Sequence, residues 1–547
     1  MSCLKKAKIK VYTREAQEGY SSSLGNSVHL AYWDEGWGYR NLYHNYGILF
    51  AEAEISGTNE IIEKGLINPR ICYDANRGYC ITALRANADG TVDESCSGKV
   101  LLWTTEDFTF FHAHGLVEEV HTWTDSSEEV EVPEPVGFQA LMYWALVRNT
   151  AVEVPEFVQA SSQEDMEKVR ALAMYSDGSV AFKSVDWDCN SVDWHTPGDY
   201  PVTGQVRSCE YGFPLAKGYA DPDITYWDGA YYFIATNDNT DDVGLYIRRA
   251  DTVAELFAEE VAEYLILDKD PERHLIQTFW APELHIIAGQ LYILFAVGAE
   301  QWAPKCHMMR LKEGGDPTRA EDWTDPVKVL DKEGQDLNPE GITLDMTYLK
   351  VRDRSYLVWS SRINCMAPGD TGSMLYIGEI DEACPERLIS DKVLLSRPLY
   401  GWENNAGTIN NEGPYPLLAN NAVYIMYSGG AAGGDSYAVG CLKIAADGDL
   451  LNPAEWMKSP TALLASAHFK GIYGPGHNAF TVDENGDVLI TYHAQQVPGR
   501  GQRCTGIHRV HFGADGRPLL YMTAERDLSP ALAEVHTRVT VPGDTAH

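Results

Sequence analysis

The sequence predicts an all-β protein whose C-terminal two-thirds folds as a five-bladed β-propeller. Three observations lead to this prediction: one turn-and-strand pattern occurs five times, its copies are evenly spaced, and helical periodicity is scarce. A fixed period of several dozen residues built from strand-turn-strand units is typical of propellers. The alternative that remains open is an irregular all-β sandwich in which the turns recur by coincidence.

Each copy of the pattern is a turn containing Asp, Asn or Gly, followed by an aromatic-rich apolar strand. Such a combination predicts a hairpin turn that enters a strand. Successive copies begin roughly 60 to 67 residues apart, and five copies predict five blades. The copies are residues 227–234, 288–295, 353–359, 420–427 and 484–492.

A sixth copy of the same pattern lies near the N-terminus, at residues 74–82, and a further apolar strand follows at residues 98–103. We therefore expect residues 1–121 to form a β-rich accessory region of one or two blade-like units. These units are too few to close a ring, so their apolar strands must pack on another part of the protein. We expect this region to be required for folding.

Short strands and turns around a central Trp187 characterise the segment between the accessory region and the repeats. This pattern is typical of a small β-sandwich. The segment resembles bacterial immunoglobulin-like domains, which are spacers or packing modules, although carbohydrate binding stays open. The predicted domains are the accessory region at 1–121, an immunoglobulin-like sandwich at 122–208, the propeller at 209–536 and a tail at 537–547.

The charge of the chain limits its partners. The net charge is −36 at pH 7, and we find no cluster of Lys and Arg. A nucleic-acid-binding face needs such a cluster, and an anionic membrane surface would repel this chain. We therefore expect no nucleic-acid or membrane partner and a neutral ligand; the sequence does not indicate the oligomeric state.

Cysteine usage and the N-terminal sequence both bear on the cellular compartment. The eleven cysteines are odd in number, scattered and without a CxxC pair, which argues against a disulfide framework and a structural zinc site. No apolar run of signal-peptide length follows the N-terminal lysines. These features predict a soluble cytoplasmic protein.

Three acidic residues occupy comparable places in the repeats. Asp221, Asp345 and Glu412 each precede a repeat strand, where strand starts would line the central channel of a propeller. Converging carboxylates repel one another, so the pKa of at least one of them should rise. Glycoside hydrolysis needs one protonated acid and one ionised carboxylate, which such a group can supply.

Five short motifs around these acids resemble glycoside hydrolase family 43, over residues 212–500. The resemblance implies an inverting hydrolase in which Asp221 is the general base, Asp345 modulates the acid's pKa and Glu412 is the general acid. Asp223 is the alternative base. The motifs, in order, are Ala220-Asp221-Pro222, Trp280-Ala281-Pro282-Glu283-Leu284-His285, Leu344-Asp345-Met346-Thr347, Asn411-Glu412-Gly413-Pro414 and Gly474-Pro475-Gly476-His477-Asn478.

Further residues near the motifs are candidates for substrate contacts, with a packing or capping role as the alternative for each. No cofactor is expected to be required. His477 resembles a family histidine that contacts a central ion, commonly calcium, through water, so a structural Ca²⁺ in the channel is a further expectation. A buried structural histidine is the alternative. The candidate substrate-binding residues are Trp280, Glu283, Arg362, Asn411 and His477.

The stretch from Gly440 to Asn478 most resembles the exo-acting α-L-arabinofuranosidases of the family. This resemblance implies removal of terminal arabinofuranose from neutral oligosaccharides. β-Xylosidase, exo-galactosidase and galactofuranosidase activities stay open, as do a non-catalytic carbohydrate-binding propeller and a scaffold propeller. In the accessory region, Asn68 aligns with Asp221, and an amide cannot act as a base, so we expect no catalysis there.

Overall fold

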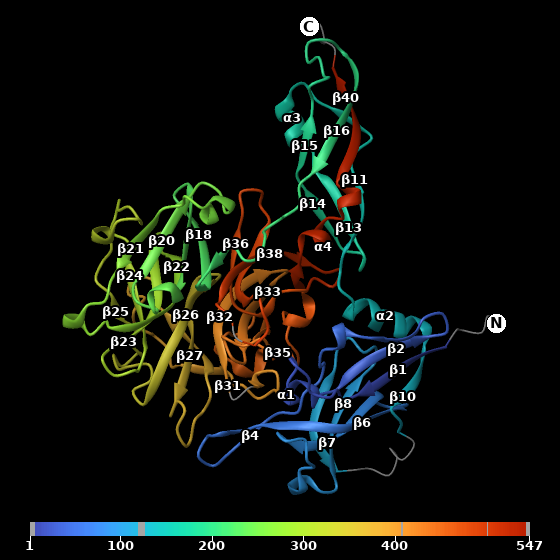
Figure 1. The fold of residues 1–547 in the computed structure, drawn as a ribbon, viewed down its shortest axis with the longest axis vertical. Coiled ribbons are helices and arrows are strands. Elements are labelled where there is room, and N and C mark those ends of the chain that lie inside the picture. Colours follow the sequence, from blue (N-terminus) through green and yellow to red (C-terminus); the bar gives the residue numbers. More distant parts are fainter. Residues whose placement is uncertain (1–5, 119–125, 406–407, 500, 543–547) are drawn as a thin grey trace. The chain divides into compact units, whose positions relative to one another are not determined.

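The computed structural model describes residues 6–118, 126–405, 408–499 and 501–542, and β-strands dominate it (Figure 1). The predicted all-β class is confirmed. The chain divides into two compact units. The larger contains residues 1–145, 213–481 and 491–506, and the smaller contains residues 146–212, 482–490 and 507–547.

Four consecutive four-stranded antiparallel sheets form most of the larger unit, each with its strands paired in chain order. The predicted turns at 227–234, 288–295, 353–359 and 420–427 join the first two strands of these sheets. The sheets are β18(Tyr219–Trp227)-β19(Ala230–Asn237)-β20(Leu245–Ala250)-β21(Glu263–Leu267), β22(Gln277–Ile287)-β23(Gln290–Gly298)-β24(Lys305–Arg310)-β25(Val327–Lys328), β26(Gly341–Val351)-β27(Arg354–Ile363)-β28(Met374–Ile380)-β29(Val393–Ser396) and β32(Asn411–Ala419)-β33(Ala422–Gly429)-β34(Ala438–Ala445)-β35(Met457–Lys458).

A fifth sheet contains strands from both ends of this region. β36(Tyr473–Val482), β37(Val488–Gln495) and β38(Cys504–Phe512) follow one another along the chain, and β39(Pro518–Met522) pairs with β38. The short strand β17(Ala216–Lys217), which precedes the first sheet, also pairs with β38. The beginning and the end of the repeat region therefore meet in one sheet.

The first strand of every one of these five sheets contains a residue with left-handed backbone. This conformation costs a non-glycine residue about 1–2 kcal/mol and interrupts the hydrogen-bonded ladder, so a bulge re-aims the neighbouring side chains. A left-handed residue within each first strand therefore directs the neighbouring side chains in a comparable way. The residues are Asp221 (φ 52°), Ala281 (φ 44°), Asp345 (φ 54°), Gly413 (φ 55°) and His477 (φ 48°).

Two further four-stranded sheets form the N-terminal region. In the second of them the predicted turn at residues 74–82 joins β6 to β7, and Asn68 (φ 51°) lies in a bulge of β6, as Asp221 does in β18. The helix α2(Glu134–Trp144) contacts the first sheet. The sheets are β10(Glu129–Pro133)-β1(Lys6–Tyr12)-β2(His29–Asp34)-β3(Gly38–Asn41) and β6(Lys64–Asp74)-β7(Gly78–Asn87)-β8(Lys99–Thr105)-β9(His112–Glu118).

The N-terminal region packs against the sheet that begins with β32. Tyr46 and Phe50 share a buried cluster with Trp402 and Val423. The backbone N–H of Ala53 also donates to the carbonyl of Leu399 at 2.7 Å. The apolar strands of the N-terminal region share a core of their own with α2, so the expectation that they pack on another part of the protein is wrong for the strands; the loop residues Tyr46 and Phe50 make the contact with the sheet of β32.

Besides β39 and parts of β37 and β38, the smaller unit contains two sheets of short strands. One is β11(Asn149–Glu153)-β13(Ala171–Tyr175)-β14(Val180–Lys183), and the other is β12(Phe157–Gln159)-β40(Glu534–Val541)-β16(Gly198–Val206)-β15(Val185–Asp188). The turns and strands predicted around Trp187 are therefore present. Their cores contain small clusters of buried apolar side chains.

The predicted domain boundaries differ from the structure at two places. Strand β40 pairs with β16 over eight residue pairs, so the predicted break between 536 and 537 cuts a strand of the smaller unit rather than starting a tail. Residues 134–144, predicted within the sandwich, form α2 and belong to the larger unit, because this helix buries Ala140 and Trp144 in the N-terminal core. The boundary at 121–122 lies outside the described residues.

Within the described ranges, no helix combines the length and apolar character needed to cross a membrane. The ten cysteines that the structure describes are free thiols.

Candidate active site

The three predicted acids lie on the first strands of three different sheets. Asp221 is in β18, Asp345 is in β26 and Glu412 is in β32. They are 6%, 2% and 9% exposed, respectively, and Asp345 interacts electrostatically with both other carboxyls. The structure therefore brings together the three acids that the sequence placed 67 or more residues apart.

One carboxyl oxygen of Asp221 accepts a hydrogen bond, and the other faces two histidines and an arginine. Thr236 Oγ1 donates to Oδ2 at 2.6 Å, while Nδ1 of His477 and Nδ1 of His493 lie 3.1 and 3.0 Å from Oδ1. The Arg503 guanidinium approaches the same oxygen to 3.6 Å. Burial alone would raise the pKa of Asp221, but His477, Arg503 and His493 outweigh it and hold that pKa well below its usual value. Asp221 is therefore ionised at neutral pH.

The surroundings of Asp345 and Glu412 raise the pKa of both carboxyls, in contrast to Asp221. Burial, together with the charge of Asp221, raises the pKa of Glu412 to about 7, against the hydrogen bond from Tyr437. Burial and the charge of Glu412 raise the pKa of Asp345 well above its usual value. Because these two carboxyls interact, their protons belong to the pair. The Asp345–Glu412 pair therefore retains a proton at neutral pH.

Asp223, the alternative base, has both carboxyl oxygens engaged inside the protein. Oδ2 accepts the backbone N–H of Leu284 at 2.8 Å, and Oδ1 accepts the hydroxyl of Tyr415 at 3.1 Å. Asp223 is fully buried, and burial raises its pKa to about 6. Both oxygens of Asp223 thus accept hydrogen bonds within the protein, whereas Oδ1 of Asp221 has no hydrogen-bond partner among the described residues, which favours Asp221 as the base.

Glu283 is buried beside His285. Oε2 of Glu283 lies 2.6 Å from Nε2 of His285. Burial raises the pKa of Glu283 well above its usual value and lowers that of His285 to about 4. At neutral pH this is a neutral carboxyl–imidazole pair; a contact of Glu283 with substrate stays a prediction.

Trp280 belongs to a pair of indole rings. Its Nε1–H donates to Oδ2 of Asp242 at 2.7 Å, and its ring centroid lies 6.4 Å from that of Trp302 in a T-shaped arrangement. Trp302 is 43% exposed. The sequence analysis did not select Trp302, because nothing in its local pattern separates it from any loop tryptophan.

The guanidinium of Arg362 donates hydrogen bonds to residues of two neighbouring loops. Its Nε and Nη2 donate to the two carboxylate oxygens of Asp370 at 2.7 and 2.6 Å, and Nη1 donates to Oδ1 of Asn410 at 3.1 Å. Its charge also acts on Glu412. Arg362 thus braces the β27–β28 connection next to the acid, and a direct contact with sugar stays a prediction.

Asn411 does not bind substrate as predicted. Its side chain is 0% exposed, Nδ2 donates to Oε1 of Glu403 at 2.8 Å, and Oδ1 accepts the Ser396 hydroxyl at 2.6 Å. Glu403 is itself paired with Lys458 at 2.7 Å. Asn411 therefore anchors the strand start that precedes Glu412, which is a structural role.

Several residues that contact the acids were missed by sequence reasoning. Four of them lie on second strands or in loops, and one, Tyr415, directly follows the fourth motif on β32; no local pattern distinguishes them. His493 directly follows the last predicted repeat, residues 484–492, so the regular spacing of the repeats would have placed it near the others. The missed residues are Thr236, Tyr415, Tyr437, His493 and Arg503.

The residues near His477 do not fit a directly bound calcium ion. Calcium takes six to eight oxygen ligands. No group of three or more His, Cys, Asp or Glu side chains among the described residues could hold a metal. The buried Nε2 of His477 and the side-chain amide of Asn478 have no hydrogen-bond partner within the described part of the chain. Contact of His477 with an ion through water stays a prediction.

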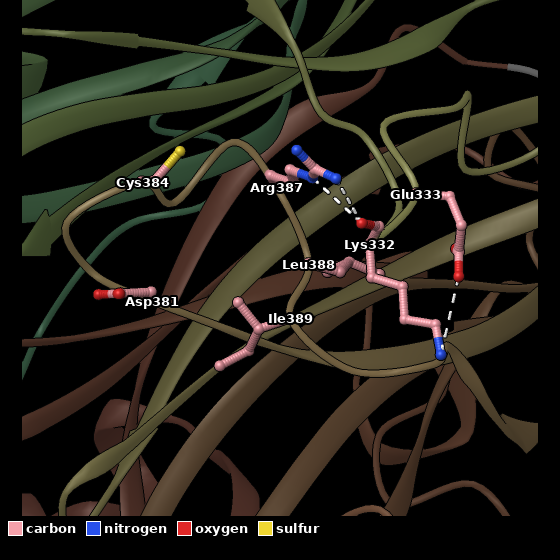
Figure 2. Close-up of a pocket in the computed structure, with 7 residues that line it drawn as sticks. All are labelled: Lys332, Glu333, Asp381, Cys384, Arg387, Leu388 and Ile389. Atoms are coloured by element: carbon pink, nitrogen blue, oxygen red, sulfur yellow. Dashed lines mark hydrogen bonds and ion pairs between the residues drawn. The ribbon is translucent and has the colours of Figure 1, made fainter.

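A surface pocket lies apart from these acids. It is lined by Lys332, Glu333 and the segment Asp381–Ile389, and Arg387 closes it by donating to the carbonyl of Lys332 at 2.6 Å (Figure 2). None of the predicted site residues lines it.

Glycoside hydrolysis needs an ionised carboxylate together with a carboxyl that keeps its proton, and these three acids supply that combination. The family model for glycosyl hydrolases family 43 matches residues 213–518, and the chain belongs to this family. The matched range contains the four consecutive sheets and the three acids. The chain is therefore a glycoside hydrolase, as predicted.

Named relatives and a solved structure show the same relationship. The chain is 36% identical over 300 residues to an extracellular exo-α-(1→5)-L-arabinofuranosidase of Streptomyces chartreusis, covering 53% of this chain and 84% of that protein. It is 32% identical over 317 residues to the Streptomyces avermitilis protein of the same name, covering 56% and 62%. The crystal structure of an α-L-arabinofuranosidase from Lactobacillus brevis is 31% identical, with a TM-score of 0.50, covering 57% and 98%.

Proposed function

We propose that this chain is an inverting, exo-acting α-L-arabinofuranosidase that removes terminal arabinofuranose from neutral oligosaccharides. One observation carries the reaction: Asp221 is held ionised while the Asp345–Glu412 pair holds a proton, within one buried group. The assignment of arabinofuranose as the sugar rests on the 31–36% sequence identity to arabinofuranosidases.

The opposite protonation states assign the roles of base and acid. Asp221 removes a proton from a water molecule whose oxygen forms a bond to the anomeric carbon. Glu412 gives its proton to the glycosidic oxygen as the bond from that oxygen to the anomeric carbon breaks. Because water attacks from the face opposite to the leaving group, the product has inverted configuration. The enzyme then regains its starting state when a proton passes from Asp221 to solvent and Glu412 is reprotonated.

Asp345 acts on Glu412 without touching the reacting atoms. It accepts the backbone N–H of Gly413 and so orients the residue that follows the acid. Its proximity favours retention of a proton by the pair. Trp280 with Trp302, Arg362 and His477 are proposed as the side of the site that receives the sugar, because aromatic faces stack on sugar rings and charged donors bind hydroxyls.

We infer that the five sheets of residues 216–522 are the five blades of a propeller. Four consecutive four-stranded sheets, a left-handed residue in each first strand and the β17–β38 pairing all support this arrangement. The smaller unit is proposed to be immunoglobulin-like, from its two small sheets. Its binding of carbohydrate remains a prediction.

Other activities of the same chemistry remain as alternatives. The three acids would serve a β-xylosidase, an exo-galactosidase or a galactofuranosidase equally well. A carbohydrate-binding propeller without catalysis would not require an ionised base opposite a protonated acid. A cytoplasmic location stays a prediction, and two relatives bear the word extracellular in their names. Nucleic acid and membranes are not expected partners at a net charge of −36.

The test is release of para-nitrophenol from its α-L-arabinofuranoside, β-D-xyloside and galactosides, with Glu412→Gln as the control. We expect turnover of the arabinofuranoside, loss of turnover in the variant, and a product of inverted configuration by proton NMR. Turnover of another glycoside would leave the proposed mechanism intact but would show that arabinofuranose is the wrong sugar. No turnover of any glycoside, natural oligosaccharides included, would overturn the proposal.

A further inference from the structure

Glu412 is held from the interior of the protein by one of its two carboxyl oxygens. The hydroxyl of Tyr437 lies 2.9 Å from Oε1. Tyr437 immediately precedes β34 and is 0% exposed. Its ring stacks on the imidazole of His493, with centroids 5.3 Å apart and planes 9° from parallel. The tyrosine that contacts the acid is therefore also packed on a histidine that contacts Asp221.

The hydrogen bonds behind Tyr437 have a defined direction. The backbone N–H of His477, which can only donate, donates to Oγ of Ser428 at 2.7 Å. Ser428 is fully buried, so its own hydrogen needs an acceptor, and its hydroxyl bonds with that of Tyr437. When Ser428 donates to Tyr437, the hydrogen of Tyr437 is directed to Oε1 of Glu412.

We propose that Tyr437 is a positioning residue that fixes the transferable proton of Glu412 on Oε2. An oxygen that accepts from Tyr437 is the carbonyl oxygen of the protonated acid, so the acid hydrogen lies on the other oxygen. The proton that leaves for the glycosidic oxygen thus starts from one defined atom. This proposal rests on the proposed function, in which Glu412 is the general acid.

The ring of Tyr437 has little freedom to leave this position. Gly476 lies against it, and a Cβ at Gly476 would fall 2.2 Å from Cδ1 of Tyr437. The loop before Tyr437 is held as well, because the carbonyl of Ala432 accepts Nε2–H of His493 at 2.9 Å. Gly476 of the Gly474-Pro475-Gly476-His477 motif therefore leaves the space that the ring of Tyr437 occupies beside Glu412.

The same hydrogen bond strengthens Glu412 as an acid. Bonding to the ionised carboxylate favours it, so Tyr437 lowers a pKa that burial raises. Without the hydroxyl, that pKa would be higher than about 7. Asp221 from β18 also raises the pKa of Glu412, whereas Arg362 from β27 and Arg503 before β38 lower it. Asp345 from β26 faces Glu412 as well, and its own pKa is raised by that carboxyl.

The test is Tyr437→Phe, assayed with two arabinofuranosides of different leaving groups. A dinitrophenolate leaves without protonation, whereas a sugar alcohol must be protonated. We expect kcat on an arabino-oligosaccharide to fall about 10- to 100-fold, a large part of a typical general-acid contribution, and kcat on the dinitrophenyl glycoside to change less than about threefold. The alkaline limb of kcat/KM should move to higher pH.

Two further variants complete this test. Tyr356→Phe removes a buried tyrosine hydroxyl from β27, outside the site, and should leave both the leaving-group ratio and the pH profile unchanged. Ser428→Ala removes the donor behind Tyr437 and should shift the alkaline limb in the same direction, which keeps the test decisive if Tyr437→Phe does not fold. Equal losses on both substrates with an unmoved alkaline limb would overturn the proposal. An inactive wild-type protein would instead overturn the proposed function.

Discussion

The backbone N–H of Gly413 donates to Oδ2 of Asp345 at 3.0 Å, which ties this carboxyl to the residue that follows Glu412. Gly413 can adopt its φ of 55° without strain, and a Cβ there would lie 2.9 Å from the ring of His477. A single peptide unit thus connects two acids on different sheets. Two properties of the acid, its orientation and its retained proton, depend on this connection.

Replacement of Asp345 by Asn should weaken catalysis and shift its pH dependence. An amide cannot ionise, so Glu412 would no longer share its proton with an interacting carboxyl, and the alkaline limb of kcat/KM should move to lower pH. We expect kcat to fall about 100-fold, within the usual range for acid–base catalysis. The measurement is a pH profile with the para-nitrophenyl arabinofuranoside. An alkaline limb that moves to higher pH would contradict the assigned role.

Replacement of Asp221 by Asn should abolish hydrolysis but leave a site that azide can use. An amide cannot take a proton from water, whereas azide attacks the anomeric carbon without a base. We expect hydrolysis to fall at least about 1,000-fold, and azide to restore turnover by forming a glycosyl azide of inverted configuration. NMR of the product checks this outcome. A glycosyl azide of retained configuration would instead indicate a covalent intermediate.

The stability of the protein should depend on the protonation of Glu412. Its folded-state pKa of about 7 lies above the ordinary value of 4.5, so the native state binds the proton more tightly than the unfolded state. The stability associated with this proton is present at low pH and is lost as pH rises from about 4.5 to 7. Glu412→Gln mimics the protonated form and should gain up to about 3 kcal/mol relative to wild type over that range.

Urea unfolding of wild type and Glu412→Gln at about pH 5 and pH 8 measures this difference. Asp345→Asn is the matched comparison. The pKa of Asp345 is also raised in the folded protein, so this variant should likewise gain stability relative to wild type as pH rises. A variant whose relative stability falls as pH rises would show that Glu412 is not held protonated by its surroundings.

The N-terminal region should contribute to folding through its contact with the sheet of β32. Phe50 is buried in the shared cluster, so Phe50→Ala should cost about 3–5 kcal/mol. Phe110→Ala, at an exposed position of the same region, should be within about 0.5 kcal/mol of wild type. Chemical unfolding provides both values. A soluble and active chain of residues 205–547 would show instead that the region is dispensable.

Trp302 should contribute to substrate affinity rather than to proton transfer. Its ring is exposed beside Trp280, where a sugar could stack. We expect Trp302→Ala to raise KM for arabino-oligosaccharides several-fold, about 1 kcal/mol of lost aromatic contact, with the alkaline limb unmoved. Trp37→Ala, which removes an exposed tryptophan from the β2–β3 turn, is the control. An unchanged KM would exclude Trp302 from the sugar site.

The sequence by itself determined the all-β class, the hairpins and the three acids. Alternating apolar and aromatic residues after Asp, Asn or Gly turns are local signals, because strand and turn preferences act over a few residues. The acids were found because each stands a few residues before a repeated hairpin, and the same repeat also identified the hairpin of β6 and β7.

Only the tertiary structure decided the protonation states and the partners of the acids. The low pKa of Asp221 comes from His477, His493 and Arg503, and the bond that holds Glu412 comes from Tyr437. The role of Asn411 was wrongly predicted for the same reason: its exposure depends on Glu403 and Ser396, which reach it through packing. The placement of β40 beside β16 likewise depends on contacts over more than 300 residues. Electrostatics and burial act through space, and local sequence patterns carry no information about them.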